Sequence, residues 1–231
     1  MRRMKKNWIG AFCIAVASSA MAEQDPYESF NRKVFAVNDA IDTAVLKPVA
    51  QGYQSVVPTP AQRAVGNFFD NLSEIPNFVN GVLQGKPDTA VTALGRFVFN
   101  TTLGVGGLFD VMDDFGLSEK PEDFGQTLAV WGVQSGPYLV LPIFGPSSVR
   151  DGAARFTVDF STDAINHLKP ESDRWSATLL SAVDTRASLL SAEKFLQGDR
   201  YTAVRNAYLS NREFQVNDGE SAEADEFLDD F

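Results

Sequence analysis

Apolar side chains recur at helical spacing along most of this chain, and few segments alternate with the period of a β-strand. Asp25-Pro26-Tyr27-Glu28 combines an N-cap, a proline at the first helical position and a capping-box glutamate. Lys47-Pro48 predicts the end of this first helix and the start of a shorter one toward Val57. The apolar stripe of the first helix is Tyr27, Phe30, Val34, Val37, Ile41 and Val45.

The next helices are delimited by proline and glycine. Thr59-Pro60-Ala61-Gln62 resembles a second capping box, Ile75-Pro76 predicts a break, and Gly85 predicts a stop. Pro87-Asp88 opens a longer helix, which Gly104 to Gly107 ends. The side of this helix that we expect to be buried carries Val91, Leu94, Phe97, Val98 and Thr101.

Further helices are predicted in the second half of the chain. Glu122 and Asp123 favour a helix start and a helix to about Trp131. Ser148-Val149-Arg150-Asp151 resembles another capping box. A long helix after Pro170 carries Trp175, Leu179, Val183 and Leu190. Asp199 is predicted to cap a final helix with Tyr201, Val204, Tyr208 and Leu209.

The elements predict an all-α protein with a single domain. Short connections argue against two domains, and the many Pro and Gly breaks argue against a simple four-helix bundle. We expect this domain over residues 23–212. Residues 213–231 hold eight Asp or Glu and no Lys or Arg, which predicts an acidic, disordered tail.

Residues 1–22 are predicted to be a signal peptide. Four basic residues precede the apolar run from Trp8 to Ala17, and Ala20-Met21-Ala22 is a small-residue cleavage site. A retained membrane helix is the alternative, but the apolar run is short for a span. The single cysteine, Cys13, lies in this run after Phe12, so we expect it to leave with the signal.

Composition narrows the function classes. Loss of the signal would leave 16 basic residues against 30 acidic ones, a net charge near −14, which argues against a nucleic-acid partner. The chain has 18 Phe against 5 Tyr and 3 Trp, which suits a core or a lipid-facing surface. After the signal, no apolar run approaches the ~18 residues of a membrane span.

The sequence offers few residues or motifs that could form an enzyme active site. His167 is the one histidine. The sequence has no G-x-S-x-G elbow of a serine hydrolase, no H-E-x-x-H zinc motif and no G-x-x-x-x-G-K-[ST] phosphate-binding loop. We therefore expect no catalytic residue, no metal and no cofactor. His167 is interpreted as a helix-end residue, and Gly104 to Gly107 as a helix stop with a flexible joint.

The segment Gly132 to Gly145 is apolar and rich in Gly and Pro, and Pro142 excludes a regular helix there. Two interpretations stay open: a buried core segment, or a mobile loop, hinged at Gly132 and Gly136, that faces lipid or gates an opening. Asn31-Arg32 and Arg150-Asp151 are likewise either satisfied surface or cap pairs, or the lining of a polar interior.

Five ordered segments resemble the MlaA (VacJ) family and cover most of residues 25–212. They begin with DPYESFNR, continued by Phe35 and Asn38, and with RFVFNTTLG followed by GGLFD. They continue with EDFGQTL and with GPYLVLP running into GPSSVRD. The last is Thr185-Arg186-Ala187 with Tyr201 and Arg205 to Tyr208.

The resemblance implies a helical ring in the periplasmic half of the outer membrane, apolar outside and with a polar central channel. Such a ring removes misplaced phospholipid from the outer leaflet and passes it to a soluble periplasmic carrier, from which it reaches an inner-membrane ABC transporter complex. Family members also bind trimeric porins and are often acylated on a cysteine after the signal, a position where this chain has none.

The resemblance also implies which residues form the site. Gly132, Val133, Gln134, Ser135 and Gly136 match the loop at the channel mouth. Asn38 and Asp39 lie where alteration unbalances lipid flow, and Asp151, beside Arg150, matches a polar position near the channel. The alternatives are a periplasmic or outer-membrane phospholipase and a porin-binding structural envelope protein.

Overall fold

The computed structural model describes residues 25–195 and 198–219, so the predicted signal peptide and most of the acidic tail lie outside the described residues. The described chain is almost entirely helical and forms one domain, as predicted. The N-terminal half comprises α2 (Glu28–Ile41), the π-helix η1 (Asp42–Leu46), α3 (Lys47–Val56), α4 (Thr59–Leu83), α5 (Pro87–Thr102), α6 (Val111–Asp114) and α7 (Phe124–Val130). The C-terminal half comprises β1 (Tyr138–Leu141), β2 (Gly145–Ser148), α8 (Val149–Ala154), η2 (Arg155–Asp159), α9 (Phe160–Thr162), η3 (Ala164–His167), α10 (Glu171–Leu189), η4 (Ala192–Phe195) and α11 (Arg200–Val216).

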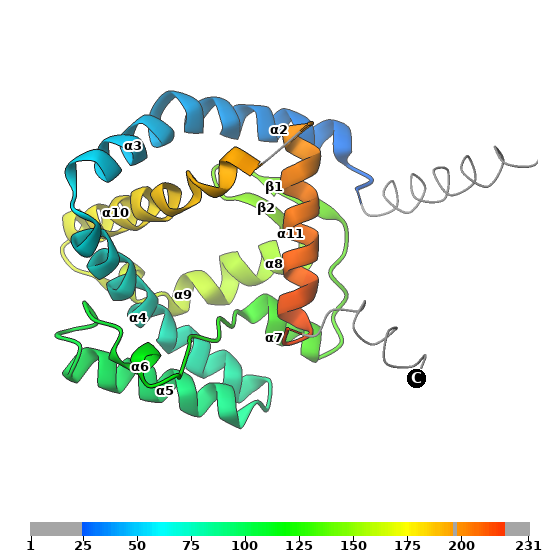
Figure 1. Ribbon diagram of the computed structural model, residues 1–231. Helices are drawn as coiled ribbons and strands as arrows, with labels where there is room; N and C mark the ends of the chain where they lie inside the picture. The colour runs from blue at the N-terminus through cyan, green and yellow to red at the C-terminus, as the bar shows by residue number, and fades with distance from the viewer. Residues whose placement is uncertain (1–24, 196–197, 220–231) are drawn as a thin grey trace, which may run out of the picture.

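The helices are arranged as a ring (Figure 1). In that view α2 and α3 arch over the top, α4 descends on one side to its partner α5, and α11 forms the opposite side above α7. α10 packs against α3 and α4, and α11 contacts both α7 and β2. Two sets of side chains close the ring at α11: Tyr201 and Arg205 bind Asp25 before α2, and Arg212 binds Asp123 before α7.

Two predicted helix breaks are wrong, because the chain stays helical through Pro48 and Pro76. The π-helical turn η1 shifts the hydrogen-bond spacing just before Pro48, which accommodates the missing N–H of that proline. Pro76 lies inside α4, whose packing against α5 on both sides of the proline keeps the helix continuous. α2, η1 and α3 therefore form one long curved rod.

The predicted caps have mixed outcomes. Ser148 caps α8 by accepting from the Asp151 N–H, as predicted. Asp123, expected to favour the start of α7, caps it by accepting from the Gln126 N–H. Asp199 is the N-cap residue of α11, as predicted, but its carboxylate makes no capping hydrogen bond. The capping boxes at Asp25 and Thr59 are wrong, because neither α2 nor α4 has a side-chain cap. The Asp25 carboxylate is used in long-range contacts instead.

The side of α5 that was expected to be buried faces outward. Val91, Leu94 and Val98 are exposed, and Val91 retains 70% of its accessible surface. The buried face carries Thr89, Ala90, Ala93, Arg96 and Asn100. The buried face of its partner α4 carries Asn71, Glu74, Asn77, Asn80 and Gly81. The two helices thus meet through polar and small residues, with their apolar stripes directed away from the ring.

The apolar core is small. Tyr138, Val140 and Tyr201 form it, and partly buried hydrophobic residues of α2 and α11 pack against them: Val34, Phe35, Tyr208 and Leu209. Tyr201 contacts Phe35 and Tyr138 edge to face, with ring centroids 5.5 and 6.4 Å apart. This core lies where β1 and α11 approach α2, and it fixes the hairpin against the ring.

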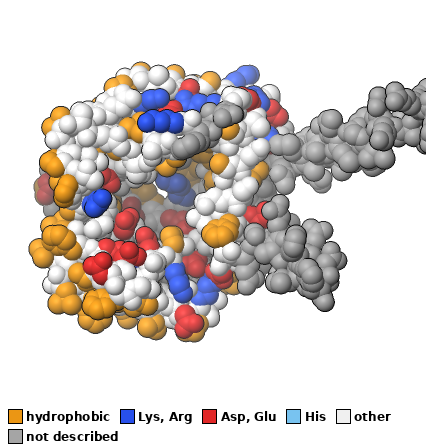
Figure 2. Space-filling model, viewed as in Figure 1, with side chains coloured by type: hydrophobic (Ala, Val, Ile, Leu, Met, Phe, Trp, Pro, Cys, Tyr) orange, Lys and Arg blue, Asp and Glu red, His pale blue; other side chains and the backbone are white. Residues whose placement is uncertain are grey.

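Large hydrophobic side chains instead cover the outside. In Figure 2 they gather along the outer margin of the ring. On the α2–η1–α3 rod the exposed stripe is Phe30, Val37, Ile41, Val45, Val49 and Val56. Further exposed apolar residues lie on α5, α7, α9 and α10. No helix in residues 25–195 and 198–219 is both long and apolar enough to cross a membrane.

Candidate functional site

A hollow opens in the middle of the face shown in Figure 2, with Lys, Arg, Asp and Glu side chains gathered around it. The hairpin, the start of α8, α7 and α11 form one side of this region (Figure 1). Most of the residues expected to form a gate lie on this side, and their hydrogen bonds show how each is held.

The predicted loop contains an antiparallel hairpin that the sequence pattern did not indicate. β1 and β2 pair Tyr138 with Ser148 and Leu141 with Gly145. Pro142 lies in the turn, where its missing N–H is tolerated, and Ile143 has a positive φ of 70°. The buried-core interpretation is confirmed for Tyr138 and Val140, whereas Ile143 at the turn is 82% exposed. The mobile gate stays a prediction.

Two asparagines of α2 bind the hairpin backbone. The Asn31 amide donates to the Tyr138 carbonyl (3.0 Å) and accepts from the Val140 N–H (3.0 Å). The Asn38 amide donates to the Leu141 carbonyl (2.9 Å) and accepts from the Ile143 N–H (2.9 Å). Residues seven apart lie on one face of a helix, so these amides act together like a partner strand along the edge of β1.

The segment Gly132, Val133, Gln134, Ser135 and Gly136 lies against the start of α8. The Arg150 N–H donates to the Ser135 carbonyl (3.0 Å), and its guanidinium lies 3.4 Å from the Val133 carbonyl. Gly132 and Gly136 both have positive φ angles (87° and 68°), and a Cβ on Gly136 would lie 3.2 Å from Val149. Glycine is therefore required at the two ends of this segment for its path past α8.

Asp151 is the centre of a buried network. Its carboxylate accepts from Arg150 (2.9 Å), from Tyr208 (2.8 Å) and from two nitrogens of Arg212 (2.9 and 3.0 Å). Burial alone would raise the pKa of Asp151, but Arg212 and these other donors lower it to about 2. Arg212 also binds both oxygens of Asp123, at 2.6 and 2.7 Å. One guanidinium therefore joins α11 to α7 and α8.

Asp39 occupies a different environment. It pairs with Arg200 at the start of α11, and Arg200 also binds Glu193 (2.8 Å). The structure therefore brings Asn38, Arg150, Asp151 and residues 132–136 together around the hairpin and α8. Asp39 instead belongs to an ionic cluster where α3, η4 and α11 meet.

A second buried network lies between α4 and α5. Glu74 pairs with Arg96, and Arg96 also binds Asp110 (2.8 Å) and the Leu117 carbonyl (2.6 Å). Asn100 donates to Asp110 (2.9 Å) and accepts from the Met112 N–H (3.1 Å). These contacts fix the path of the loop from Leu103 to Leu117, so the Gly104 to Gly107 helix stop is confirmed and is held by polar side chains.

Sequence reasoning missed Glu74, Arg96, Arg205 and Arg212 as interior residues. The sequence does hold a pattern that points to a polar interior. On α4 a polar residue recurs every third position, which places polar groups on one face: Asn71, Glu74, Asn77 and Asn80. The apolar stripe of α4 predicts burial on its own face, whereas the structure buries this polar stripe.

The one histidine does not lie in a catalytic arrangement. His167 ends η3, as predicted, is exposed, and contacts the Ser161 carbonyl through Nε2 (2.7 Å). No group of three or more His, Cys, Asp or Glu in the described part of the chain could hold a metal ion.

Comparisons with known proteins show which family this chain is similar to. A family model described as MlaA lipoprotein matches residues 23–215. The intermembrane phospholipid transport system lipoprotein MlaA of Escherichia coli (strain K12) is 35% identical over 215 residues, which cover 90% of this chain and 84% of that protein. An uncharacterized protein of Rickettsia bellii is 36% identical over 195 residues, covering 83% of this chain and 76% of the relative.

A solved structure, described as the structural basis for maintenance of bacterial outer membrane lipid asymmetry, also matches. Its TM-score is 0.71 at 36% identity, and the match covers 83% of this chain and 98% of that chain.

Proposed function

The chain belongs to the MlaA lipoprotein family, and on that premise we propose that it is the outer-membrane component of an intermembrane phospholipid transport system. It removes mislocalised phospholipids from the outer leaflet and so maintains lipid asymmetry. The observation that carries this proposal is the inverted distribution of side chains, apolar outside and polar inside.

The physical argument follows from the two parts of a phospholipid. The headgroup is charged, and its passage through hydrocarbon is costly, so a hydrophilic path lowers the barrier. The acyl chains favour apolar surface such as the exposed stripes on the α2–η1–α3 rod and α5. A ring of amphipathic helices can lie in one leaflet with this surface against lipid and pass the headgroup through its centre.

We propose that the hairpin and the adjoining segment, Gly132 to Gly136, control the passage. Asn38 holds the exposed turn, and Arg150 holds the segment beside Asp151. Release of the Asn38 hydrogen bonds would let the turn move without disturbing the buried end of the hairpin at Tyr138 and Val140. These contacts support a gate hinged at its core-facing end.

We extend this proposal to the protein's location and its partners. The protein acts from the periplasmic side of the outer membrane after export and removal of residues 1–22. It associates with a trimeric porin and passes lipid to a soluble periplasmic carrier. The exposed apolar stripes supply surface for the bilayer and for a porin's membrane face.

The proposed activity is transfer rather than bond cleavage, so no catalytic residue is required. His167→Ala discriminates this from a phospholipase. Cells that carry the variant should keep normal surface phospholipid, and the purified variant should transfer lipid as well as the wild type does. Loss of activity in His167→Ala would instead favour the hydrolase.

A locked hairpin tests the gate. Cys13 is the chain's one cysteine and lies in the signal, so Asn38→Cys with Ile143→Cys gives a single pair that a short thiol crosslinker can join. In a strain that lacks the gene, the wild type should lower surface-exposed phospholipid and restore detergent resistance, and the reduced pair should do so at least in part. The crosslinked pair should fail. Equal surface phospholipid in crosslinked and reduced cells would refute the gate, whereas failure of the wild type would refute the transport function itself.

A further inference from the structure

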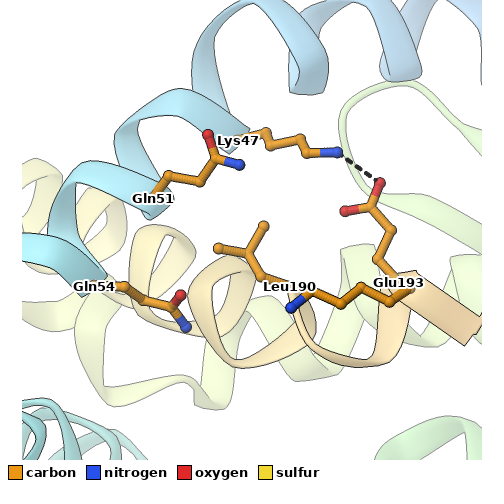
Figure 3. Close-up of a pocket in the computed structure, with 6 residues that line it drawn as sticks. Lys47, Gln51, Gln54, Leu190 and Glu193 are labelled. Carbon is orange, nitrogen blue, oxygen red and sulfur yellow. Dashed lines mark hydrogen bonds and ion pairs between the residues drawn. The ribbon is translucent and has the colours of Figure 1, made fainter.

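A pocket of about 390 Å³, lined mainly by polar residues, lies apart from the hairpin, between α3 and the segment that follows α10 (Figure 3). α3 contributes Lys47, Gln51 and Gln54 to its wall, and the other side carries Leu190, Glu193 and Lys194. In Figure 3 Lys47 and Glu193 reach toward each other across one end, while the Leu190 side chain projects from its wall toward α3. The volume is that of a small-molecule site.

Glu193 does not need Lys47 for charge compensation. It accepts from Arg186 (2.8 Å) and Arg200 (2.8 Å) as well as from Lys47 (3.1 Å). The Arg186 hydrogen bond, reinforced by Lys47 and Arg200, lowers the pKa of Glu193 to about 2. Two arginines would still pair with this carboxylate if the Lys47 ammonium turned to another anion.

The groups around the pocket carry an excess of positive charge. The cations are Lys47, Arg186, Lys194 and Arg200, and the anions that face them are Asp39, Asp42 and Glu193. Within the described residues Lys194 forms no ion pair, and its side chain is exposed. This local excess of one positive charge stands out in a chain whose formal charge is −10.

The polar donors suit a tetrahedral anion. An ammonium has three N–H donors, of which Lys47 uses one on Glu193. Gln54 is occupied, because its Nε2 donates to the Ala187 carbonyl (2.8 Å). The Gln51 side chain forms no hydrogen bond within residues 25–195 and 198–219, and its amide extends into the pocket in Figure 3.

We propose that this pocket binds the phosphate of a phospholipid headgroup, with Lys47 and Lys194 as the binding cations and Gln51 as a neutral donor. The choice of a lipid phosphate rests on the proposed function. Lysines bind phosphate as point charges without a fixed fork geometry, so Lys47 can exchange Glu193 for the ligand. Leu190 supplies an apolar surface for the glycerol carbons, and the acyl chains remain outside.

Calorimetric titration of the detergent-solubilised full chain with three probes tests the site. Dihexanoyl phosphatidylglycerol presents a lipid phosphate, dihexanoylglycerol presents the same chains without it, and sodium phosphate presents the free anion. We expect the phosphatidylglycerol to bind, the free phosphate to bind at least tenfold more weakly, and the diacylglycerol not to bind. Equal binding of the diacylglycerol would overturn the proposal, and binding of free phosphate alone would overturn the assignment to a lipid headgroup.

The variants separate the pocket from general charge effects. Lys47→Gln with Lys194→Gln should weaken phosphatidylglycerol binding at least tenfold, and Lys47→Arg should retain most of it. The control pair Lys33→Gln with Lys120→Gln removes the same charge at exposed positions and should change affinity less than twofold. Should the double variant fail to fold, Lys194→Gln alone, which breaks no ion pair in the described chain, should still weaken binding about threefold. Wild-type affinity in the folded variants would refute the site.

Complementation of a deletion strain distinguishes this failure from failure of the proposed function. A wild-type protein that does not lower surface phospholipid refutes the transport function. A wild-type protein that restores asymmetry, combined with unchanged binding in the lysine variants, refutes only the phosphate site.

Discussion

Asn38 accepts a hydrogen bond from the backbone N–H of Ile143 at 2.9 Å, although the two residues are 105 positions apart in the chain. Ile143 is 82% exposed, so few side-chain contacts hold the turn. The second Asn38 contact, to the Leu141 carbonyl, holds the other end of the same turn. One amide on the α2–η1–α3 rod thereby holds the backbone of the turn at both ends, beside the edge-to-face contact of Phe144 with Phe156 (5.3 Å).

Asn38→Ala should release this tip. Two hydrogen bonds of about 0.5–1.5 kcal/mol each are lost, or about 1–3 kcal/mol together, so we expect the protection of the Ile143 amide against hydrogen exchange to fall roughly 5- to 160-fold. The Val140 amide, which Asn31 binds, should keep its protection.

Asn67→Ala is the matched control for this measurement. Its amide also donates to a backbone carbonyl, that of Leu108 (3.1 Å), at an exposed position away from the hairpin. This variant should leave exchange at Ile143 unchanged. An Ile143 amide that stays fully protected in Asn38→Ala would show that Asn38 does not hold the turn.

Gly125 is placed against the Arg212 and Asp151 side chains, and an added Cβ would collide with both. Gly125→Ala should therefore displace the guanidinium that joins α11 to α7 and α8, and it should lower the free energy of unfolding by about 1–3 kcal/mol. Urea denaturation monitored by circular dichroism measures this.

Gly95→Ala provides a control with the opposite sign. Gly95 lies within α5, and a Cβ there meets no atom within 4 Å. The higher helix propensity of alanine should raise stability by about 0.5–1 kcal/mol. If both variants shifted stability in the same direction, contact of Gly125 with Arg212 would not be the cause.

The sequence predicted the positions of the longer helices better than their environment. Helical periodicity located α5, α7, α10 and α11, because that period arises whether the apolar face meets a core or lipid. The pattern alone does not say which face is buried. Val91 and Ala93 illustrate this: the larger residue is exposed, and the smaller one is at the contact with α4.

Local sequence patterns are limited in the same way for the candidate site, because they do not show which distant residues contact it. Local motifs and the family resemblance together pointed to residues 132–136, Arg150 and Asp151, and Arg150 contacts both that segment and Asp151. The partners that bind Asp151 from a sequence-distant helix are Tyr208 and Arg212 of α11, and no local spacing predicts such a contact. The hairpin was missed because Pro142 and the glycines interrupt the alternation expected of a strand.

Glu119 should make stability depend on pH. Burial and the nearby carboxylates of Asp70 and Glu74 raise its pKa from 4.5 to about 7, against the opposing effects of Asn77 and Arg96. Because the folded-state pKa is raised, the stabilising contribution is complete below pH 4.5 and is lost as the pH rises through 7. The folded protein then carries a repelled, partly desolvated charge.

Glu119→Gln removes this titration. The wild type should lose stability between pH 4.5 and pH 8, and the variant should not. The difference in unfolding free energy between variant and wild type should therefore rise by on the order of 1–3 kcal/mol from pH 4.5 to pH 8. Chemical denaturation at a series of pH values gives the difference directly. Parallel stability curves for the two proteins between pH 4.5 and 8 would show that Glu119 does not titrate in this range.

Val91 tests the orientation of the whole ring. It is 70% exposed at the outer face of α5, and its helix neighbours on that face, Leu94 and Val98, are also exposed. If this face contacts acyl chains, Val91→Asp should reduce co-flotation with phospholipid vesicles severalfold, because burying a carboxylate among acyl chains costs free energy. In detergent-free buffer the free energy of unfolding should change by less than about 0.5 kcal/mol, because the side chain has few protein contacts to lose.

Two matched substitutions complete this test. Ser172→Asp introduces the same charge at an exposed polar position of α10 and should leave flotation unchanged. Ala93→Asp introduces it into the buried contact with α4, where an unpaired carboxylate should lower the free energy of unfolding by several kcal/mol. An ordinary water-facing surface would give a different result: Val91→Asp and Ser172→Asp would float equally well, and the apolar exterior would then have no role in binding lipid.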